Sequence, residues 1–397
     1  MPDIYYITAS YPYGAGESFL QPEIDEWLRR GKTVSVIPTY ARGKIRQNFS
    51  GECDPRGRRL FRLSYLFYGL LWLLIKPMAV IAIVSKLMHA PGKLPKNLLI
   101  MFKAFSTAWF VRRNPAAHLH AHWAGVSSTF ALIVSRLTDI PWSLTCHRWD
   151  IYDNNLIAIK SRDAVFTRFI SQRGMLDALK LGVDKDKVVV IHMGVSRERS
   201  TIQKTSPSAT PAIFCAANLL EVKGHCYLIR ALRLLRDAGI TVTLHLFGDG
   251  PLRDKLGKYA QNQGVGDAVF FLGHRSQEEL FAAYRAGAAD IFVLPSIHVA
   301  DGDHEGVPVS LIEAMSFGIP VISTKTGSID ELLPSHLGLT VPDKNPEMLA
   351  DAIAKLLNDD NRYSEVSHTV SNLVSQYWTA EICIDSLSKL IFPESTG

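Results

Sequence analysis

Residues 295–320, PSIHVADGDHEGVPVSLIEAMSFGIP, decide the fold of this chain. The apolar run Ile291–Leu294 precedes this segment and predicts a strand, and Ser310–Phe317 within it predicts a helix. The segment runs into a second apolar stretch, Pro320–Ser323, which predicts another strand. A strand, a loop, a helix and a strand in this order form a βαβ unit, which favours a parallel sheet covered by helices.

The same alternation continues on both sides of this segment. Strands are predicted upstream at Ala212–Ala216, Val242–Phe247 and Val269–Leu272, with helical segments between them. A separate series begins at the N-terminus with a strand at Ile4–Ala9, a helix at Ser18–Arg30 and a strand at Thr33–Ile37. A chain of 397 residues is too long for one ordinary core. We therefore predict an α/β fold of two Rossmann-like, doubly wound domains, facing across a cleft where ligands would bind.

The domain boundaries follow from composition. Residues 201–211, TIQKTSPSATP, are rich in Ser, Thr and Pro and predict a linker. This places an N-terminal domain at residues 1–200 and a C-terminal domain at 212–378, followed by a terminal helix at 379–397. The five cysteines include no CxxC pair, which argues against a zinc site and a disulfide framework and favours a reducing compartment. The N-terminus lacks a basic segment before an apolar core, so no signal peptide is expected.

The stretch Arg42–Arg113 is strongly basic and contains fourteen Lys or Arg but only two acids, Glu52 and Asp54, a net charge of +12. It also holds two apolar runs, Leu63–Ile75 and Pro77–Ser85, each shorter than the roughly 18 residues a membrane span needs. Basic side chains among Leu, Trp and Phe suit a helix lying on an anionic membrane surface. The alternative is a buried helix pair with lysines at its rim. Nucleic acid is not expected, because gripping phosphates does not need such apolar runs.

Two carboxylates flank the start of the predicted helix in residues 295–320. Glu305 lies in the loop and Glu313 lies eight residues later, near the first helical turn. Between them, Gly306, Val307 and Ser310 can present backbone N–H groups at a helix N-terminus, which suits a diphosphate. Glu313 could accept hydrogen bonds from a ribose diol, and Glu305 could reach hydroxyls of a sugar. In the alternative interpretation, Ser310 and Glu313 form a capping box that needs no ligand.

The string EGVPVSLIE, residues 305–313, resembles the E-x7-E signature of glycosyltransferase family 4. GIPVIS at 318–323, GSIDEL at 327–332 and GDGPLR at 248–253 continue the resemblance, and ESFLQPEI at 17–24 with the HxHxH run at 118–122 is similar to the branch that builds exopolysaccharides such as colanic acid. The resemblance implies the GT-B fold, with a nucleotide diphosphate sugar bound mainly to the C-terminal domain and the acceptor to the N-terminal one. It also implies that the last helix crosses back to the first domain.

The resemblance implies further donor-binding residues. In this family an Arg, and a Lys five residues later, hold the donor phosphates after the first strand of the second domain. Lys223 keeps its place here, but Asn218 stands where the Arg is expected, and an amide cannot replace a guanidinium fork. His274 or Arg275 could compensate. Gly248 belongs to the matching GDGPLR string, and Gly14 and Gly16 would let the first loop approach the donor phosphate.

Several polar residues of the first domain are candidates for the sugar and acceptor side. His147 follows the predicted strand Trp142–Cys146, and the resemblance implies that it faces the donor sugar, where it could orient the sugar or ease proton transfer. A His that satisfies a strand-end carbonyl is the alternative. Asp150 is expected to be structural or to brace His147. His118, His120 and His122 alternate on one strand face, and we expect them to shape the acceptor site rather than to bind metal.

Together these features predict a retaining, metal-independent hexosyltransferase that uses a nucleotide diphosphate sugar, needs no further cofactor, and acts on a lipid-linked glycan during exopolysaccharide or cell-surface polysaccharide synthesis. It would be cytoplasmic and peripheral on the inner face of the plasma membrane. No protein nucleophile is clearly placed, so a front-face reaction is expected. Two alternatives remain: a catalytically weak binding subunit of a polysaccharide-assembly complex, suggested by Asn218, and a nucleotide-sugar epimerase.

Overall fold

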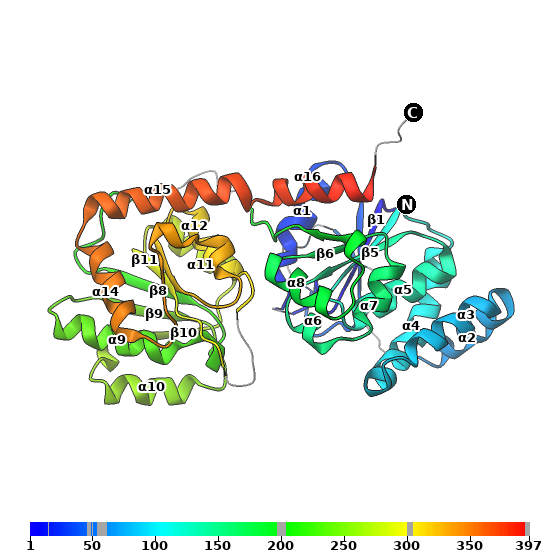
Figure 1. Ribbon diagram of the computed structural model, residues 1–397, viewed down its shortest axis with the longest axis horizontal. Coiled ribbons are helices and arrows are strands. Elements are labelled where there is room, and N and C mark those ends of the chain that lie inside the picture. Colours follow the sequence, from blue (N-terminus) through cyan, green and yellow to red (C-terminus); the bar gives the residue numbers. More distant parts are fainter. Residues whose placement is uncertain are drawn as a thin grey trace. The chain divides into compact units, whose positions relative to one another are not determined.

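The computed structural model describes residues 1–14, 16–45, 49, 51–53, 62–196, 204–299 and 305–393. The chain divides into two compact units (Figure 1). We call Met1–Gly194 with Ala380–Gly397 the first unit, and Val195–Thr379 the second unit. Each unit is an α/β sandwich with its own parallel sheet.

The sheet of the first unit has seven parallel strands in the order β3-β2-β1-β4-β5-β6-β7. The strands are β1 (Ile4–Thr8), β2 (Val34–Pro38), β3 (Glu52–Cys53), β4 (His118–His122), β5 (Trp142–Cys146), β6 (Thr167–Phe169) and β7 (Val188–Val190). Every residue of β1, β2, β4 and β5 is buried. Central parallel strands are covered on both faces, which is why they are rich in apolar residues. The strand β4, HLHAH, departs from that pattern by carrying three buried histidines.

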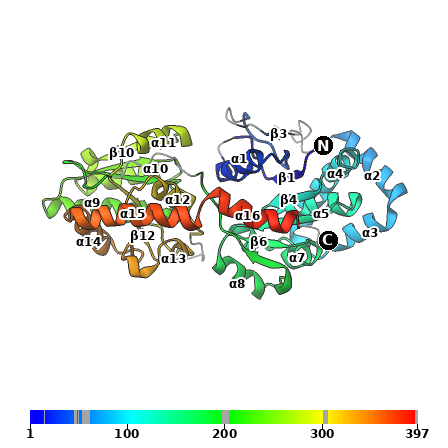
Figure 2. The same ribbon diagram turned by 90° about the horizontal axis from the view of Figure 1, so that it is seen from above.

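Helices cover both faces of this sheet. The described α-helices are α1 (Gln21–Arg29), α2 (Leu63–Ile75), α3 (Pro77–Leu87), α4 (Leu94–Val111), α5 (Val126–Thr138), α6 (Trp149–Asp153), α7 (Ile157–Asp163), α8 (Gln172–Lys180) and α16 (Ala380–Ile391). The terminal helix α16 lies against α1 (Figure 2), where Ile384 and Leu387 share a buried cluster with Ile24 and Trp27. The end of the chain is therefore part of the core of the first unit.

The sheet of the second unit has six parallel strands in the order β10-β9-β8-β11-β12-β13. They are β8 (Ala212–Ala216), β9 (Thr243–Phe247), β10 (Val269–Gly273), β11 (Ile291–Leu294), β12 (Val321–Thr324) and β13 (Thr340–Val341). The α-helices are α9 (His225–Asp237), α10 (Arg253–Asn262), α11 (Gln277–Arg285), α12 (Val309–Ser316), α13 (Ile329–Leu332), α14 (Pro346–Leu357) and α15 (Asp360–Tyr377). The strand order reverses direction between β8 and β11, and such a switch point is where doubly wound sheets bind ligands.

The linker at residues 201–211 stays a prediction. The division between the two units falls between Gly194 and Val195, and residues 204–211 belong to the second unit. The buried carboxylate of Asp290 holds this segment, because it accepts hydrogen bonds from Lys204 Nζ (2.8 Å), from the Ser208 amide (2.8 Å) and from the Ala212 amide (2.8 Å). Residues 201–203 lie outside the described residues. Composition suggested a linker because Ser, Thr and Pro are equally suited to a segment bound by side-chain hydrogen bonds.

The two apolar runs of the basic stretch form the helices α2 and α3. No single helix among the described residues is long and apolar enough to cross a membrane, but α2 and α3 together pass that test with a bend of 117° between them. In α2, Tyr65, Gly69 and Trp72 are buried. The Trp72 indole donates a hydrogen bond to the Phe105 carbonyl (2.9 Å). One face of α2 thus packs on α4, so the pair is only half buried.

Candidate active site

The carboxyl ends of β8 and β11 bring together two residues that the sequence analysis singled out. Lys223 Nζ lies 2.5 Å from Glu305 Oε2. Ser296, which follows β11, donates a hydrogen bond from its hydroxyl to the same oxygen (2.9 Å). Glu305 is buried, and the Lys223 side chain is 20% exposed. The result is a nearly dry ion pair with an open side at the lysine, next to the start of α12.

A close approach of two loops makes this pair. Gly224 has a φ of +63°, and a Cβ at this position would lie 2.0 Å from the Pro295 carbonyl oxygen. Any side chain there would push the Lys223 loop away from the loop that leads to Glu305. Ile297 also donates its amide to the Val222 carbonyl (2.8 Å). The backbone therefore holds Lys223 and Ser296 at the same edge of the sheet.

Gly248 has a similar role at the end of β9. Its φ is +135°, and a Cβ there would lie 2.1 Å from the Ala217 carbonyl oxygen. The neighbouring residue on that loop, Asn218, is exposed at the same edge. Of the two residues expected to compensate for the missing Arg, Arg275 is paired with Glu279 (3.2 Å) and His274 is exposed. Lys223, in contrast, is in contact with Glu305.

The helix α12 begins at Val309 with Pro308 as its N-cap, and no side chain caps it. The capping box predicted as an alternative for Ser310 and Glu313 is therefore wrong. A capping box needs its acid at the third helical position, and Glu313 is the fifth residue of α12. Glu313 instead accepts a hydrogen bond from Gln277 Nε2 of α11. Gly306 and Ser310 are half-buried, and Val307 is buried at the start of the helix.

Burial raises the pKa of Glu313 to about 7, although the hydrogen bond from Gln277 opposes the shift. A carboxyl whose folded pKa exceeds its unfolded value binds extra protons in the folded state, so its ionisation on raising the pH destabilises the fold. We expect the free energy of unfolding of the second unit to fall by at most about 3 kcal/mol between pH 4.5 and 7 from this group. In Glu313→Gln this part of the pH dependence should vanish. Urea unfolding at a series of pH values, followed by amide exchange in β11 and β12, measures this pH dependence. If the free energy of unfolding changed with pH equally in the unchanged protein and in Glu313→Gln, the prediction would be contradicted.

In the first unit, a chain of buried side chains leads to His147. His147 Nε2 lies 3.2 Å from His122 Nδ1, and His122 Nε2 lies 3.3 Å from Glu23 Oε1. A carboxylate only accepts hydrogen bonds, so His122 Nε2 carries a proton. When His122 carries a single proton, its Nδ1 accepts from His147, and His147 Nδ1 is left with a lone pair. Burial holds the pKa of His147 well below its usual range, which keeps the ring neutral.

Glu23 is itself held by a buried cation. Arg168 Nη1 lies 2.7 Å from Glu23 Oε2, and neither side chain is more than 1% exposed. Burial raises the pKa of Glu23, but Arg168 and His122 together lower it by more than burial raises it. The pKa therefore lies well below its usual range. The Tyr6 hydroxyl donates to Glu23 Oε1 (2.7 Å). Glu23 is thus ionised, and the sequence offered no sign of its role beyond its place in the ESFLQPEI string.

The histidines of β4 are buried, so His120 and His122 present no ring to solvent. His120 contacts Ser143 Oγ (2.7 Å) and Thr145 Oγ1 (2.8 Å) of β5 through its two ring nitrogens. Glu23, His120 and His122 are close enough to share a metal ion, yet the hydrogen bonds above account for all four ring nitrogens. Their place on the acceptor side stays a prediction, and any contribution from His122 would pass through His147.

Asp150 braces the backbone around His147. Its carboxylate accepts hydrogen bonds from the amides of His147 (3.0 Å), Arg148 (2.9 Å) and Ala124 (2.7 Å). The His147 ring lies instead against Trp123, with ring centroids 4.2 Å apart. Asp150 thus braces the loop that carries His147 through its backbone amides.

The loop after β1 is organised by Glu17, which the sequence analysis did not choose as a site residue. Its carboxylate accepts hydrogen bonds from the amides of Ser10 (2.6 Å) and Tyr11 (2.8 Å) and from the Trp123 indole (2.6 Å). Gly14 donates its amide to the Lys44 carbonyl (3.0 Å), and Gly16 is exposed. Glu17 therefore links this loop to the loop that packs on His147.

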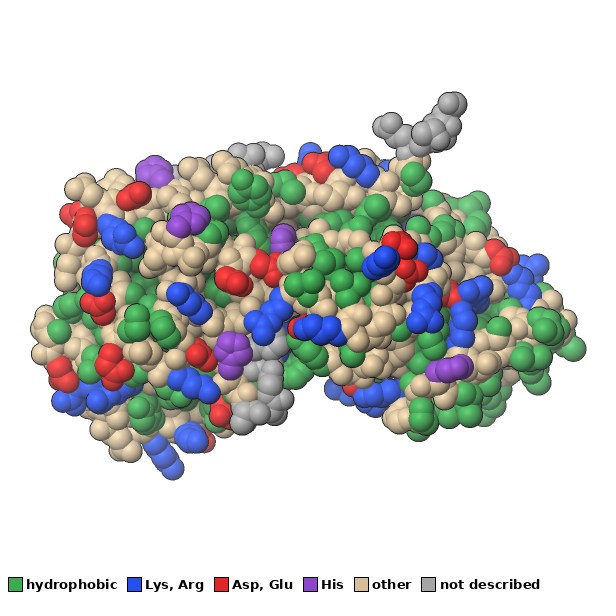
Figure 3. Space-filling model, viewed as in Figure 1, with side chains coloured by type: hydrophobic (Ala, Val, Ile, Leu, Met, Phe, Trp, Pro, Cys, Tyr) green, Lys and Arg blue, Asp and Glu red, His purple; other side chains and the backbone are tan. Residues whose placement is uncertain are grey.

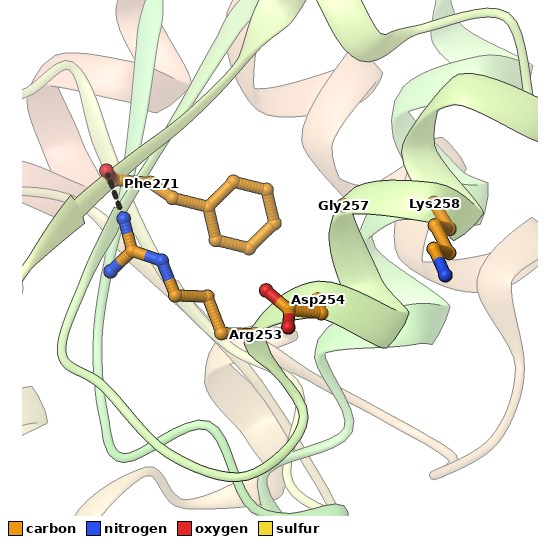
Figure 4. Close-up of a pocket in the computed structure, with 5 residues that line it drawn as sticks. All are labelled: Arg253, Asp254, Gly257, Lys258 and Phe271. Atoms are coloured by element: carbon orange, nitrogen blue, oxygen red, sulfur yellow. Dashed lines mark hydrogen bonds between the residues drawn. The ribbon is translucent and has the colours of Figure 1, made fainter.

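The described surface of the second unit also has pockets. A pocket of about 370 Å³ is lined by Arg253, Asp254, Gly257, Lys258 and Phe271 (Figure 4). Its guanidinium, from Arg253, donates to the Phe271 carbonyl at 3.4 Å. It contains none of the predicted site residues. A second pocket of about 680 Å³ lies between α9 and α10 and has a mostly apolar lining that includes Leu220, Tyr227 and Tyr259.

Comparison with known proteins finds a family model that matches most of the second unit. Residues 196–371 match the family model described as glycosyl transferases group 1. WcaL of Escherichia coli (strain K12), named for colanic acid biosynthesis, is 36% identical over 177 residues, which cover 44% of this chain and 43% of WcaL. The GDP-mannose-dependent alpha-(1-6)-phosphatidylinositol monomannoside mannosyltransferase of Mycobacterium tuberculosis (strain CDC 1551 / Oshkosh) is 28% identical over 291 residues, 70% of this chain and 74% of that protein. The match to WcaL thus spans less than half of that protein.

The fold has close counterparts among solved structures. The structure of Anabaena Alr3699/HepE in complex with UDP and glucose superposes with a TM-score of 0.70 at 16% identity, covering 99% of this chain and 100% of that one. The prediction of two Rossmann-like domains of the GT-B type is confirmed, and so is the resemblance to this group of glycosyltransferases.

Proposed function

Because its residues 196–371 match glycosyl transferases group 1, we propose that this chain is a retaining glycosyltransferase of exopolysaccharide or other cell-surface polysaccharide synthesis. It moves a hexose-type sugar from a nucleotide diphosphate sugar to a lipid-linked saccharide acceptor. The observation that carries the proposal is the Lys223–Glu305 pair beside the start of α12. A lysine next to the N-terminus of a helix offers both a charge and N–H groups to a diphosphate.

We assign the following roles to the site residues. Lys223 binds the diphosphate and stabilises the charge that develops as it leaves, while Glu305, which accepts a hydrogen bond from Ser296, holds the lysine in place. Glu305 accepts a hydrogen bond from a hydroxyl of the sugar, and Glu313 accepts hydrogen bonds from the ribose hydroxyls. His147 orients the sugar with a ring positioned by His122 and Glu23. In this proposal the cations and N–H groups supply the positive charge, so no metal ion is required.

The relatives support the proposed donor and the proposed acceptor. HepE was solved with UDP and glucose, which fits a nucleotide diphosphate sugar as donor. The mycobacterial relative is named for transfer to phosphatidylinositol monomannoside, which fits a lipid-linked acceptor. An acceptor of that kind would bring the enzyme to the cytoplasmic face of the plasma membrane as a peripheral protein.

A donor panel tests this function. Purified protein is incubated with labelled UDP- and GDP-sugars and a membrane lipid extract, and we expect label in the lipid fraction with one donor. Glu305→Ala should abolish this transfer, because it removes a sugar contact and frees Lys223. The exposed Glu347→Ala, on α14, is the matched control and should transfer normally.

Two results would contradict the proposal. Binding of a nucleotide without turnover for any donor would favour a binding subunit, the alternative suggested by Asn218. Conversion of a free nucleotide sugar to its epimer, without an acceptor, would favour an epimerase.

A further inference from the structure

The outward face of α2 and α3 is apolar where a soluble helix is polar. Leu63, Phe67, Leu70 and Leu74 of α2 are 58–81% exposed, and Met78 of α3 is 74% exposed. The helix α2, LSYLFYGLLWLLI, contains no charged residue. A surface helix of a soluble protein normally carries its charged residues on the outward face. A contiguous exposed apolar patch marks a binding surface.

Basic side chains surround this face. Arg62 precedes α2, and Lys96, Arg112 and Arg113 lie on or next to α4, all exposed. Figure 3 shows hydrophobic side chains gathered over the end of the first unit formed by α2 and α3, with Lys and Arg side chains nearby. Lys103 does not contribute, because it is buried and donates to the Pro38 and Thr39 carbonyls. Lys76 and Lys86 are paired with Asp139 and Asp163, so the positive charge around the apolar face comes from Arg62, Lys96, Arg112 and Arg113.

We propose that the outward faces of α2 and α3 insert into the interface of an anionic lipid bilayer, with the basic rim on its head groups. The bend of 117° between two short helices fits a wedge that lies in the interface rather than a span. A second copy of this chain is a poorer occupant, because a symmetric contact would set each basic rim against its equivalent. The inference deepens the proposed function by naming the element that meets the acceptor's membrane, but its test needs no transfer.

Vesicle binding tests the proposal. The full chain should sediment with phosphatidylcholine vesicles that contain phosphatidylglycerol, and high salt should weaken this binding. Leu70→Ser/Leu74→Ser should lower the partition coefficient by roughly 100-fold, about tenfold for each side chain withdrawn from lipid. Arg112→Gln/Arg113→Gln should lower it by about fivefold per charge on anionic vesicles, and have little effect on neutral ones.

Leu176→Ser is the matched control. Leu176 lies on α8 of the same unit, is 49% exposed and should bind vesicles like the unchanged protein. Thermal unfolding checks that the serine variants are folded, which is expected because the leucines replaced are exposed.

Undiminished vesicle binding by Leu70→Ser/Leu74→Ser would overturn the proposal. So would a lipid-free dimer that this variant converts to a monomer, since the occupant would then be a second copy. Loss of transfer with intact vesicle binding would instead count against the proposed function alone.

Discussion

Lys223→Met is expected to lower kcat/KM for sugar transfer by about 100- to 1,000-fold, which corresponds to about 2.7–4 kcal/mol of lost transition-state stabilisation. Lys223 is in contact with Glu305, and Asn218 cannot replace it because an amide carries no charge. Steady-state kinetics with the donor found in the panel measures the effect. Lys223→Arg should retain part of the activity, since arginine keeps the positive charge but has a guanidinium group of a different shape from the lysine ammonium.

The pairing with Glu305 makes a second comparison informative. Removing Lys223 alone takes a cation away from the buried Glu305 carboxylate, which also costs stability. The double variant Lys223→Met/Glu305→Gln removes that cost, so it should be more stable than Lys223→Met and equally inactive. The exposed pair of Lys355 and Asp351 on α14 provides the control, Lys355→Met. Full activity in Lys223→Met would show that another group holds the donor.

Arg168→Met is expected to destabilise the first unit by about 3–5 kcal/mol, the usual cost of leaving a buried charge unpaired. Arg168 joins Glu23 to the end of the chain, since its Nη2 contacts the His192 carbonyl (3.0 Å) and Cys383 Sγ of α16 (3.1 Å). Losing it leaves the ionised Glu23 without its cation and frees α16. Urea unfolding followed by amide exchange in β4 and β6 measures the loss.

The control for this variant is a surface pair of the same unit. Lys180 is 74% exposed and paired with Asp177, so Lys180→Met should change the free energy of unfolding by less than about 1 kcal/mol. The double variant Arg168→Met/Glu23→Leu should recover part of the loss, because no charge then remains buried. Equal stability of Arg168→Met and the unchanged protein would mean that water reaches Glu23.

The local elements of the fold were predictable. The strands at Ala212–Ala216 and Trp142–Cys146 agree with β8 and β5 at both ends, because a buried parallel strand is a short segment rich in apolar residues. The start of α12 was placed within one residue, but its capping box was not there, since Pro308 rather than Ser310 occupies the N-cap. Local patterns identify a helix better than they identify which residue begins it.

The candidate site was predictable residue by residue but not as a set of contacts. Glu305 and Lys223 were chosen for separate tasks, a sugar and a phosphate, and the structure joins them in one ion pair. The role of His120 and His122 on the acceptor side stays a prediction, but their contacts were not predictable, since Ser143 and Thr145 of the next strand hold His120. Which side chains a sheet face covers depends on the neighbouring strand, and that strand is not adjacent in sequence.

The sequence alone determined the two α/β domains, the basic apolar stretch, and the residue types at the strand ends, because periodicity and turn residues act over a few positions. Only the tertiary structure decided which charged residues pair with one another. Lys223 and Glu305 are 82 residues apart, and Glu23 and Arg168 are 145 apart. Tertiary packing also left one face of α2 uncovered, which its uniformly apolar sequence could not reveal. The physical reason is the same in each case: an ion pair or a buried face requires a second surface, and folding brings that surface from elsewhere in the chain.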